Sequence, residues 1–210
     1  MAMDSSGNSV HERIILAAEP LFAEFGYQNC SLLKIAKAAG TSESGVLRFF
    51  DSKQDVFLAV IENALALLHL RIGEALAAMP KRKAADAVER LLTVLKAVFD
   101  LYDEEPEKVA LIFSEGGLSI RMLKGSEGQS LMTLPGMIKL VDLFTELFAS
   151  GRAQGLFRRV DPIAAREVYF GIIEGVTLGW VLSSETNADY KSAPSKSVLD
   201  VVRRMLEGLR

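Results

Sequence analysis

The sequence predicts an all-α protein with a small N-terminal helical unit and a larger helical body. Over most of the 210 residues, apolar side chains recur every three or four positions, whereas the strict alternation of a half-buried strand is hard to find. Serine, threonine or aspartate precedes several of these segments and glycine or proline follows them, as is typical of helix ends. Half of the residues are hydrophobic, so the chain can bury a sizeable core.

The composition excludes several classes of site. Cys30 is the single cysteine and His11 and His69 are the two histidines, so an internal disulfide and a cysteine-rich zinc site are impossible, and no metal or cofactor is expected. No apolar run reaches the roughly 18 to 20 residues of a bilayer crossing, and the first residues lack the apolar stretch of a signal peptide, which predicts a cytoplasmic protein. The net charge of −3 restricts nucleic-acid binding to a local basic face.

The first predicted helix spans residues 10–25. Gly26 can end it in a left-handed conformation, and Pro20 inside it is expected to produce a kink. Its apolar stripe consists of Ile14, Ala17, Ala18, Leu21, Phe22 and Phe25.

Two shorter helices follow. Ser31 can cap a second helix that runs through residue 39, where Gly40 closes it. Thr41 or Ser42 can cap a third helix, which is expected to end near residue 50. The second and third helices thus lie on either side of a hinge of four residues.

A long fourth helix joins the two parts of the chain. Ser52, with Asp55 three residues later, forms a variant of the capping box, and the helix is predicted to reach residue 79, just before Pro80. At 1.5 Å per residue it would be roughly 40 Å long. We expect a disordered segment at residues 1–9, a helix-turn-helix domain at 10–56, and a domain for effector binding and dimerisation at 57–210.

The body is predicted to contain five further helices. They span residues 84–102, 106–114, 137–153, 162–183, and a last segment that begins at Ser195 or Ser197. The stretch 116–136 is rich in glycine and serine and is expected to be mostly loop. Pro162 suits the first turn of its helix, because proline is tolerated where the N–H has no helical partner.

The clearest functional pattern lies around the third predicted helix. It contains Ile35-Ala36, then Ala39-Gly40, and then Val46. A small residue at Ala36 lets a second helix approach closely, Gly40 supplies a positive backbone angle, and Val46 anchors the next helix from beneath. This spacing is typical of a helix-turn-helix, in which the third helix would read DNA.

The N-terminal part resembles the DNA-binding domain of the TetR family of regulators over residues 13–53, RIILAAEPLFAEFGYQNCSLLKIAKAAGTSESGVLRFFDSK. The matching residues are Ile15-Leu16-Ala17-Ala18, Leu21-Phe22, Phe25-Gly26-Tyr27, Ile35-Ala36, Ala39-Gly40, Ser42, Phe50 and Ser52-Lys53. A weaker second signature of the family consists of Gly151, Gly155, Phe157, Arg158, Asp161, Pro162 and Ala165. The resemblance implies a homodimeric repressor whose C-terminal helices dimerise and enclose an effector pocket.

Three positions depart from the family pattern. Cys30 stands where most members have threonine, Leu47 where the reading helix has tyrosine, and Phe49 where histidine or tyrosine is common. In the family these polar aromatic side chains commonly contact the DNA backbone, and neither Leu47 nor Phe49 can bond a phosphate. A helical protein that binds a small molecule, with weakened or lost DNA binding, is therefore the alternative.

Several residues are candidates for DNA contact. Arg48 is the strongest for base recognition, because a guanidinium can bond two guanine acceptors at once, worth roughly 1 to 3 kcal/mol of discrimination; a solvated surface arginine is the alternative. Gly45 would let the backbone approach the duplex, and Glu43 would either accept from a cytosine amine or repel phosphate. The other candidates are Ser31, Thr41, Ser42, Ser44, Leu47, Phe49 and Lys53. Helix capping would explain Thr41 and Ser42 equally well.

Lys53 lies in the first turn of a helix, where the dipole disfavours a cation by a few tenths of a kcal/mol or more. A nearby phosphate would reverse this preference; a hydrated surface lysine is the alternative. Residues 31–53 carry a charge of +2, from four cations and two acids, and the first helix carries three acids, among them Glu19, against Arg13. The basic face is therefore narrow, and we expect a salt dependence of only a few phosphate contacts per subunit.

The penultimate helix carries three glycines on one face. Gly171, Gly175 and Gly179 recur every four residues, which lets two helix backbones approach closely. We expect this face to form the seam of a homodimer, together with Val198, Val202 and Leu209; close packing within one subunit is the alternative.

The opposite face of that helix is predicted to look into its own subunit, where a pocket could form. The candidate lining residues are His69, Phe99, Tyr102, Phe113, Met122, Met137, Val141, Phe144, Ile173, Thr177 and Trp180. Each is also compatible with a place in the core. These residue types favour an apolar or aromatic effector of modest polarity.

The sequence thus predicts a ligand-responsive regulator: a homodimeric repressor that binds a palindromic DNA operator and is released by a small effector. The fourth helix would act as the lever between pocket and reading helix, so that effector and DNA binding are reciprocally coupled. An enzyme is not expected, because there is no glycine-rich phosphate loop, no HExxH motif and no serine or cysteine with a plausible histidine base. A helical protein that binds a partner but no ligand is a third alternative.

Overall fold

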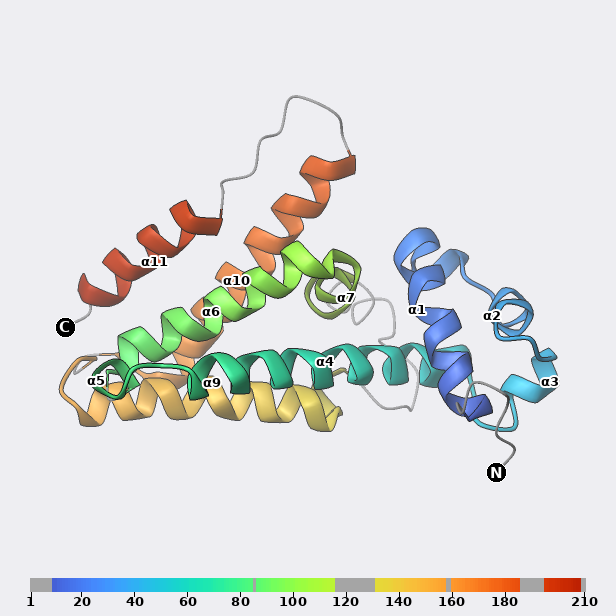
Figure 1. The fold of residues 1–210 in the computed structure, drawn as a ribbon, viewed down its shortest axis with the longest axis horizontal. Coiled ribbons are helices and arrows are strands. Elements are labelled where there is room, and N and C mark those ends of the chain that lie inside the picture. Colours follow the sequence, from blue (N-terminus) through green and yellow to red (C-terminus); the bar gives the residue numbers. More distant parts are fainter. Residues whose placement is uncertain (1–8, 85, 116–130, 158–159, 186–194, 209–210) are drawn as a thin grey trace.

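The computed structural model describes residues 9–84, 86–115, 131–157, 160–185 and 195–208. Within these ranges the chain is helical and forms no strand, which confirms the predicted all-α class (Figure 1). We call the first three helices, with the start of the fourth, the head; the remaining helices form the body. Most of the segment predicted as disordered, residues 1–8, and much of the predicted loop, residues 116–130, lie outside the described residues.

The first helix, α1 (Val10–Asn29), begins with a complete capping box. The Ser9 hydroxyl accepts from the Glu12 amide at 3.2 Å, and the Glu12 carboxylate accepts from the Ser9 amide at 2.7 Å. Its bounds extend to Asn29, but the backbone leaves helical geometry at Gly26 (φ 70°, ψ 164°), where the sequence predicted the helix to end. Glycine alone adopts this conformation at low cost. Pro20 lies inside the helix, and the residues around it keep helical dihedral angles.

The next two helices are short and capped by serine. Ser31 accepts from the Lys34 amide ahead of α2 (Leu32–Ala38), and Gly40, with φ 65°, makes the turn as predicted. Ser42 caps α3 (Glu43–Val46), which ends about four residues earlier than expected. The amides of residues 49 and 50 both donate to the Val46 carbonyl, which tightens the chain into a turn and brings Phe50 into the core.

Helix α4 (Lys53–Ala77) belongs to both head and body. Ser52 accepts from the Asp55 amide at 3.2 Å and donates to its carboxylate at 2.8 Å, as the capping variant predicts. With 25 residues the helix is roughly 37 Å long. By length and composition alone this helix could span a membrane. Half of its most apolar stretch of 18 residues is buried inside the protein, as is typical of a core helix.

The body packs around the far part of α4. Its elements are α5 (Lys81–Ala84), α6 (Ala87–Glu104), α7 (Pro106–Ala110), the π-turn η1 (Leu111–Glu115), the 3₁₀ turn η2 (Leu131–Thr133), α9 (Pro135–Ala153), α10 (Pro162–Glu185) and α11 (Ser195–Gly208). Helix α6 begins three residues later than predicted, because the Asp86 carboxylate caps it by accepting from the amides of Val88 and Glu89. Figure 1 shows α9 alongside α4, with α10 and α11 diverging above them.

Candidate nucleic-acid interface and cavity

The surface formed by α3 and the turn that follows it, which carries Arg48, presents polar and charged side chains above one buried anchor. Val46 is fully buried, as predicted, while Ser42, Glu43, Ser44 and Arg48 are exposed. Among the described residues, none forms a hydrogen bond or ion pair with the Arg48 guanidinium. We call this surface, residues 41–49, the reading face. Its geometry leaves the strongest predicted base-reading side chain available to a partner.

Three of the predicted DNA contacts also hold the head together. Ser31 and Ser42 use their hydroxyls as helix caps, and Ser42 also lies 2.9 Å from the Ser44 hydroxyl. A Cβ built on Gly45 would lie only 2.2 Å from the Thr41 hydroxyl, so a larger residue here would displace that hydroxyl. Helix capping and local packing therefore explain some of the residues that were predicted to contact DNA.

Two apolar side chains interrupt the polar reading face. Leu47 is 46% exposed and Phe49 is 44% exposed, although neither carries a group that can bond a phosphate. His11, which sequence reasoning did not place here, stacks on Phe50 with ring centroids 4.8 Å apart and meets the edge of Phe49 at 6.3 Å. Its position three residues before the buried Ile14, on the same helix face, was the available signal.

Lys53 has partners inside the chain. Its ammonium donates to the Tyr27 carbonyl at 2.7 Å and to the Gln28 carbonyl at 3.4 Å, and lies 4.3 Å from the centre of the Tyr27 ring. These carbonyls lie just after the break at Gly26, in the last residues of α1. Lys53 thus ties the start of α4 to the end of α1, a role that neither the phosphate contact nor the free surface lysine anticipated.

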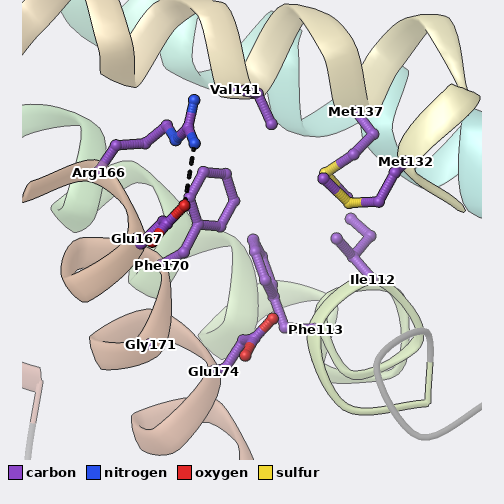
Figure 2. A pocket seen from close by; sticks show the side chains of 10 residues that line it. All are labelled: Ile112, Phe113, Met132, Met137, Val141, Arg166, Glu167, Phe170, Gly171 and Glu174. Atoms are coloured by element: carbon purple, nitrogen blue, oxygen red, sulfur yellow. Dashed lines mark hydrogen bonds and ion pairs between the residues drawn. The ribbon is translucent and has the colours of Figure 1, made fainter. Parts of the chain in front are cut away.

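A cavity of about 300 Å³ with charged side chains in its wall lies between η1, η2, α9 and α10 (Figure 2). That volume is at the lower end of small-molecule sites. It is lined by Ile112, Phe113, Met132, Met137, Val141, Arg166, Glu167, Phe170, Gly171 and Glu174. Phe113, Met137 and Val141 were predicted as pocket residues, and Met122 lies outside the described residues.

The cavity is apolar on one side and charged on the other. Figure 2 shows the two methionines and Ile112 facing the side chains of α10 across it. The Arg166 guanidinium donates to the Thr145 hydroxyl at 3.2 Å and lies 3.4 Å from the Glu167 carboxylate. Burial raises the pKa of Glu174 above its ordinary value. Such a wall suits an apolar ligand that also carries a polar group.

The other predicted pocket residues lie away from this cavity. Trp180 packs against Phe99 at 4.8 Å and Tyr102 at 4.9 Å between ring centroids, and Phe144 packs against Tyr169 and Phe170. Ile173 and Thr177 are buried, with the Thr177 hydroxyl donating to the Ile173 carbonyl. The structure therefore places these side chains in the core of the body.

His69 connects α4 to α9 instead of lining the cavity. Its Nε2 lies 2.8 Å from the Gly136 carbonyl, while the Gly136 amide donates to both carboxylate oxygens of Glu62 at 3.0 Å. A Cβ at Gly136 would come within 2.8 Å of Leu65, so this glycine permits the close approach. The beginning of α9, whose Met137 lines the cavity, is thus held directly by the helix that enters the head.

A second surface, formed by α10 and α11, is apolar. Gly171 and Gly175 are exposed, and a Cβ on either would meet nothing within 4 Å. They border a groove of about 380 Å³ with Val198 and Val202, and Val168 and Val201 stand 60% and 57% exposed nearby. We call this surface the seam face. Gly179 is buried within the subunit, and Leu209 lies outside the described residues.

Residues 14–60 match the family described as bacterial regulatory proteins, tetR family. The chain is 26% identical over 175 residues to the fatty acid metabolism regulator protein of Bacillus subtilis, covering 82% of this chain and 84% of that one. It is 26% identical over 164 residues to the HTH-type transcriptional repressor NicS of Pseudomonas putida, covering 77% and 71%.

Two solved structures share the fold over nearly their whole length. FadR from Bacillus subtilis, in complex with stearoyl-CoA, superposes with a TM-score of 0.72 at 20% identity, covering 95% of this chain and 99% of that one. AibR, in complex with isovaleryl coenzyme A and operator DNA, superposes with a TM-score of 0.66 at 19% identity, covering 94% and 97%. The helix-turn-helix domain of this chain, residues 14–60, thus belongs to the tetR family of bacterial regulatory proteins, and the helical body behind it has the fold of FadR and AibR.

Proposed function

We propose that the protein is a ligand-responsive transcriptional repressor that binds a palindromic operator as a homodimer. The reading face carries this proposal, because α3 is anchored by buried Val46 and leaves Arg48 exposed without a partner among the described residues. A guanidinium in this position can bond both acceptors on a guanine edge in the major groove. The narrow basic surface supports a salt dependence of a few phosphate contacts per subunit.

The effector that we propose is the acyl group of a coenzyme A thioester. The apolar wall of the cavity, with Phe113, Met132 and Met137, suits an acyl chain. The FadR structure holds stearoyl-CoA and the AibR structure holds isovaleryl coenzyme A, which supports the same class of ligand for this chain.

The homodimer that we propose forms through the seam face. Its exposed apolar side chains on α10 and α11 surround two glycines, so a second copy can approach closely and remove them from water. Two reading faces related by a two-fold axis would then meet two half-sites at a fixed spacing.

The proposed repressor responds to its ligand through α4. A ligand beside Met137 displaces the start of α9, which Glu62 and His69 of α4 hold through Gly136. Because α4 also carries Lys53, bonded to the end of α1, its shift changes the spacing of the two reading faces. The protein thus acts by binding rather than catalysis, and we place it in the cytoplasm, where operator and acyl-CoA meet.

Selection of bound duplexes from a random library tests this proposal. The purified protein would be used at a stated salt concentration near the physiological value. We expect recovery of a palindrome whose half-sites lie one helical turn apart or a multiple of it. Recovery of no sequence, even at low salt, would contradict the proposal and favour a small-molecule-binding protein without a functional reading face.

A further inference from the structure

Helix α1 carries an acidic residue that faces the body instead of water. Glu19 is only 9% exposed, and its Oε1 lies 2.8 Å from the Lys108 ammonium of α7. The two side chains are 11% and 18% exposed. Lys108 also pairs with Glu105, at 2.8 Å, at the start of its own helix. This is a largely buried ion pair between head and body, and Figure 1 shows α7 next to α1.

A pair of this kind is a poor source of stability, since removing two charges from water costs much of what their attraction returns. The second carboxylate oxygen of Glu19 has no hydrogen-bond partner among the described residues, which adds to that cost. Burial acts to lower the pKa of Lys108, but hydrogen bonds to Glu105 and Glu19 outweigh it and raise the pKa, so the ammonium stays charged. What the pair provides is a fixed geometry between two elements.

The position of Lys108 links this geometry to the cavity. One helical turn after it, Ile112 and Phe113 form part of the cavity wall on η1. Both α7 and η1 pack against α1. The turn at η1 is a π-helix, a rare element that is frequent at functional sites.

We propose that the Glu19–Lys108 pair is a second joint between cavity and head, in which Lys108 positions α1 and thereby the reading face. A ligand that displaces Ile112 and Phe113 moves α7 and strains or breaks the pair. This joint acts on α1, which itself packs against α4. Its response to ligand rests on the proposed function, but the mechanical link between α1 and the cavity wall does not.

Hydrogen exchange of the full-length protein tests the link without ligand or DNA. Glu19→Gln removes the charge on α1, Lys108→Met removes its partner, and Glu104→Gln serves as the matched control because it breaks an exposed pair with Arg71 between α4 and α6. We expect the amides of residues 111–113 to exchange at least threefold faster in the first two variants and at the wild-type rate in the control. Wild-type exchange at 111–113 in Glu19→Gln would overturn the proposal.

A double variant separates positioning from misfolding. Glu19→Gln with Lys108→Met leaves neither charge of the pair and should keep its cooperative thermal unfolding. We expect the same faster exchange at residues 111–113 as in the single variants. If the double variant returned to wild-type exchange, an unpaired charge would explain the single variants and the pair would have no positioning role.

The effect of ligand on operator affinity separates a positioning role of the pair from a purely structural one. Isovaleryl-CoA and stearoyl-CoA are the probes, with operator affinity followed by fluorescence anisotropy and ligand affinity by calorimetry. We expect Glu19→Gln to bind the active probe within twofold of the wild type, while the loss of operator affinity caused by that probe becomes at least threefold smaller. An unchanged loss contradicts the proposal. If neither probe changes the operator affinity of the wild type, the proposed effector class is wrong. Hydrogen exchange then still tests whether the Glu19–Lys108 pair links α1 to the cavity wall.

Discussion

The reading face and the seam face are both exposed, yet they present opposite chemistry. On the reading face, polar and charged side chains surround one buried anchor, Val46, and only Leu47 and Phe49 are apolar. On the seam face, Val168, Val201 and Met205 stand half exposed or more near two exposed glycines, whereas Val202 is only 2% exposed. A polar surface is stable in water and available to phosphate and base edges, whereas an apolar surface of this kind is stabilised by a partner. The difference supports the proposal that the reading face binds DNA reversibly and the seam face stays covered by a second copy.

The seam face offers the test with the largest expected effect. Gly175→Leu fills the space needed by a second copy, while a Cβ there meets nothing within the subunit, so the monomer should still fold. We expect a monomer by light scattering and at least a hundredfold weaker operator binding, because one half-site contact is lost. Gly73→Leu, at a similarly open glycine of α4, is the control and should leave the dimer intact. If the Gly175→Leu protein were still a dimer, the seam face would not be the dimer interface.

On the reading face, Arg48→Ala should weaken binding to the selected operator by about 1 to 3 kcal/mol, or roughly 5- to 150-fold. The loss should be confined to duplexes that keep the preferred base pair, so that specificity relaxes at one position of each half-site. Lys37→Ala, at an exposed cation outside the reading face, is the control and should weaken all duplexes equally. Equal behaviour of the two variants would reduce Arg48 to a solvated arginine.

Lys53 distinguishes a cation that contacts DNA from one that holds the head together. Lys53→Met removes the bonds to the Tyr27 and Gln28 carbonyls, and we expect about 1 to 2 kcal/mol less stability in urea unfolding. Operator binding should weaken with an unchanged salt slope, because no phosphate contact is lost. If the salt slope of operator binding fell by about one unit and the stability in urea were unchanged, Lys53 would instead contact a phosphate, as predicted from the sequence.

The smallest effect concerns how α11 is held on α6. The hydrogen bond from Arg203 lowers the pKa of Glu89 below its ordinary value of 4.5, more than burial raises it. A carboxyl with a depressed folded pKa stabilises the protein above its unfolded pKa, and this contribution is lost as the pH falls through the folded value. Wild-type stability should therefore decrease from about pH 4.5 downward more steeply than that of Glu89→Gln. Parallel curves in acid unfolding would show that the pair contributes nothing.

The head was predictable in detail because its signals are local. Ser31, Ser42 and Ser52 cap the helices that follow them, Gly40 makes the turn, and Val46 is the buried anchor, all as expected from residues within four positions. The early end of α3 was missed because the apolar residues after Val46 continue a helical pattern while the chain already turns.

The contacts between distant segments could not be predicted in this way. Lys53 meets carbonyls 25 and 26 positions earlier, and Glu19 meets Lys108 across the two parts of the molecule. In the body, aromatic residues suited to a cavity and to a core look alike in sequence. Only packing shows that Phe113 lines the cavity while Phe99 and Trp180 fill the core.

The central claim is that the cavity and the reading face are coupled, and reciprocity of binding tests it most directly. The affinity of the active acyl-CoA, isovaleryl or stearoyl, would be measured by calorimetry for the free dimer and for the dimer bound to its selected operator. We expect binding to the operator complex to be at least tenfold weaker, by the same factor by which the ligand weakens operator binding. Equal affinity for the free and the operator-bound protein would contradict the account.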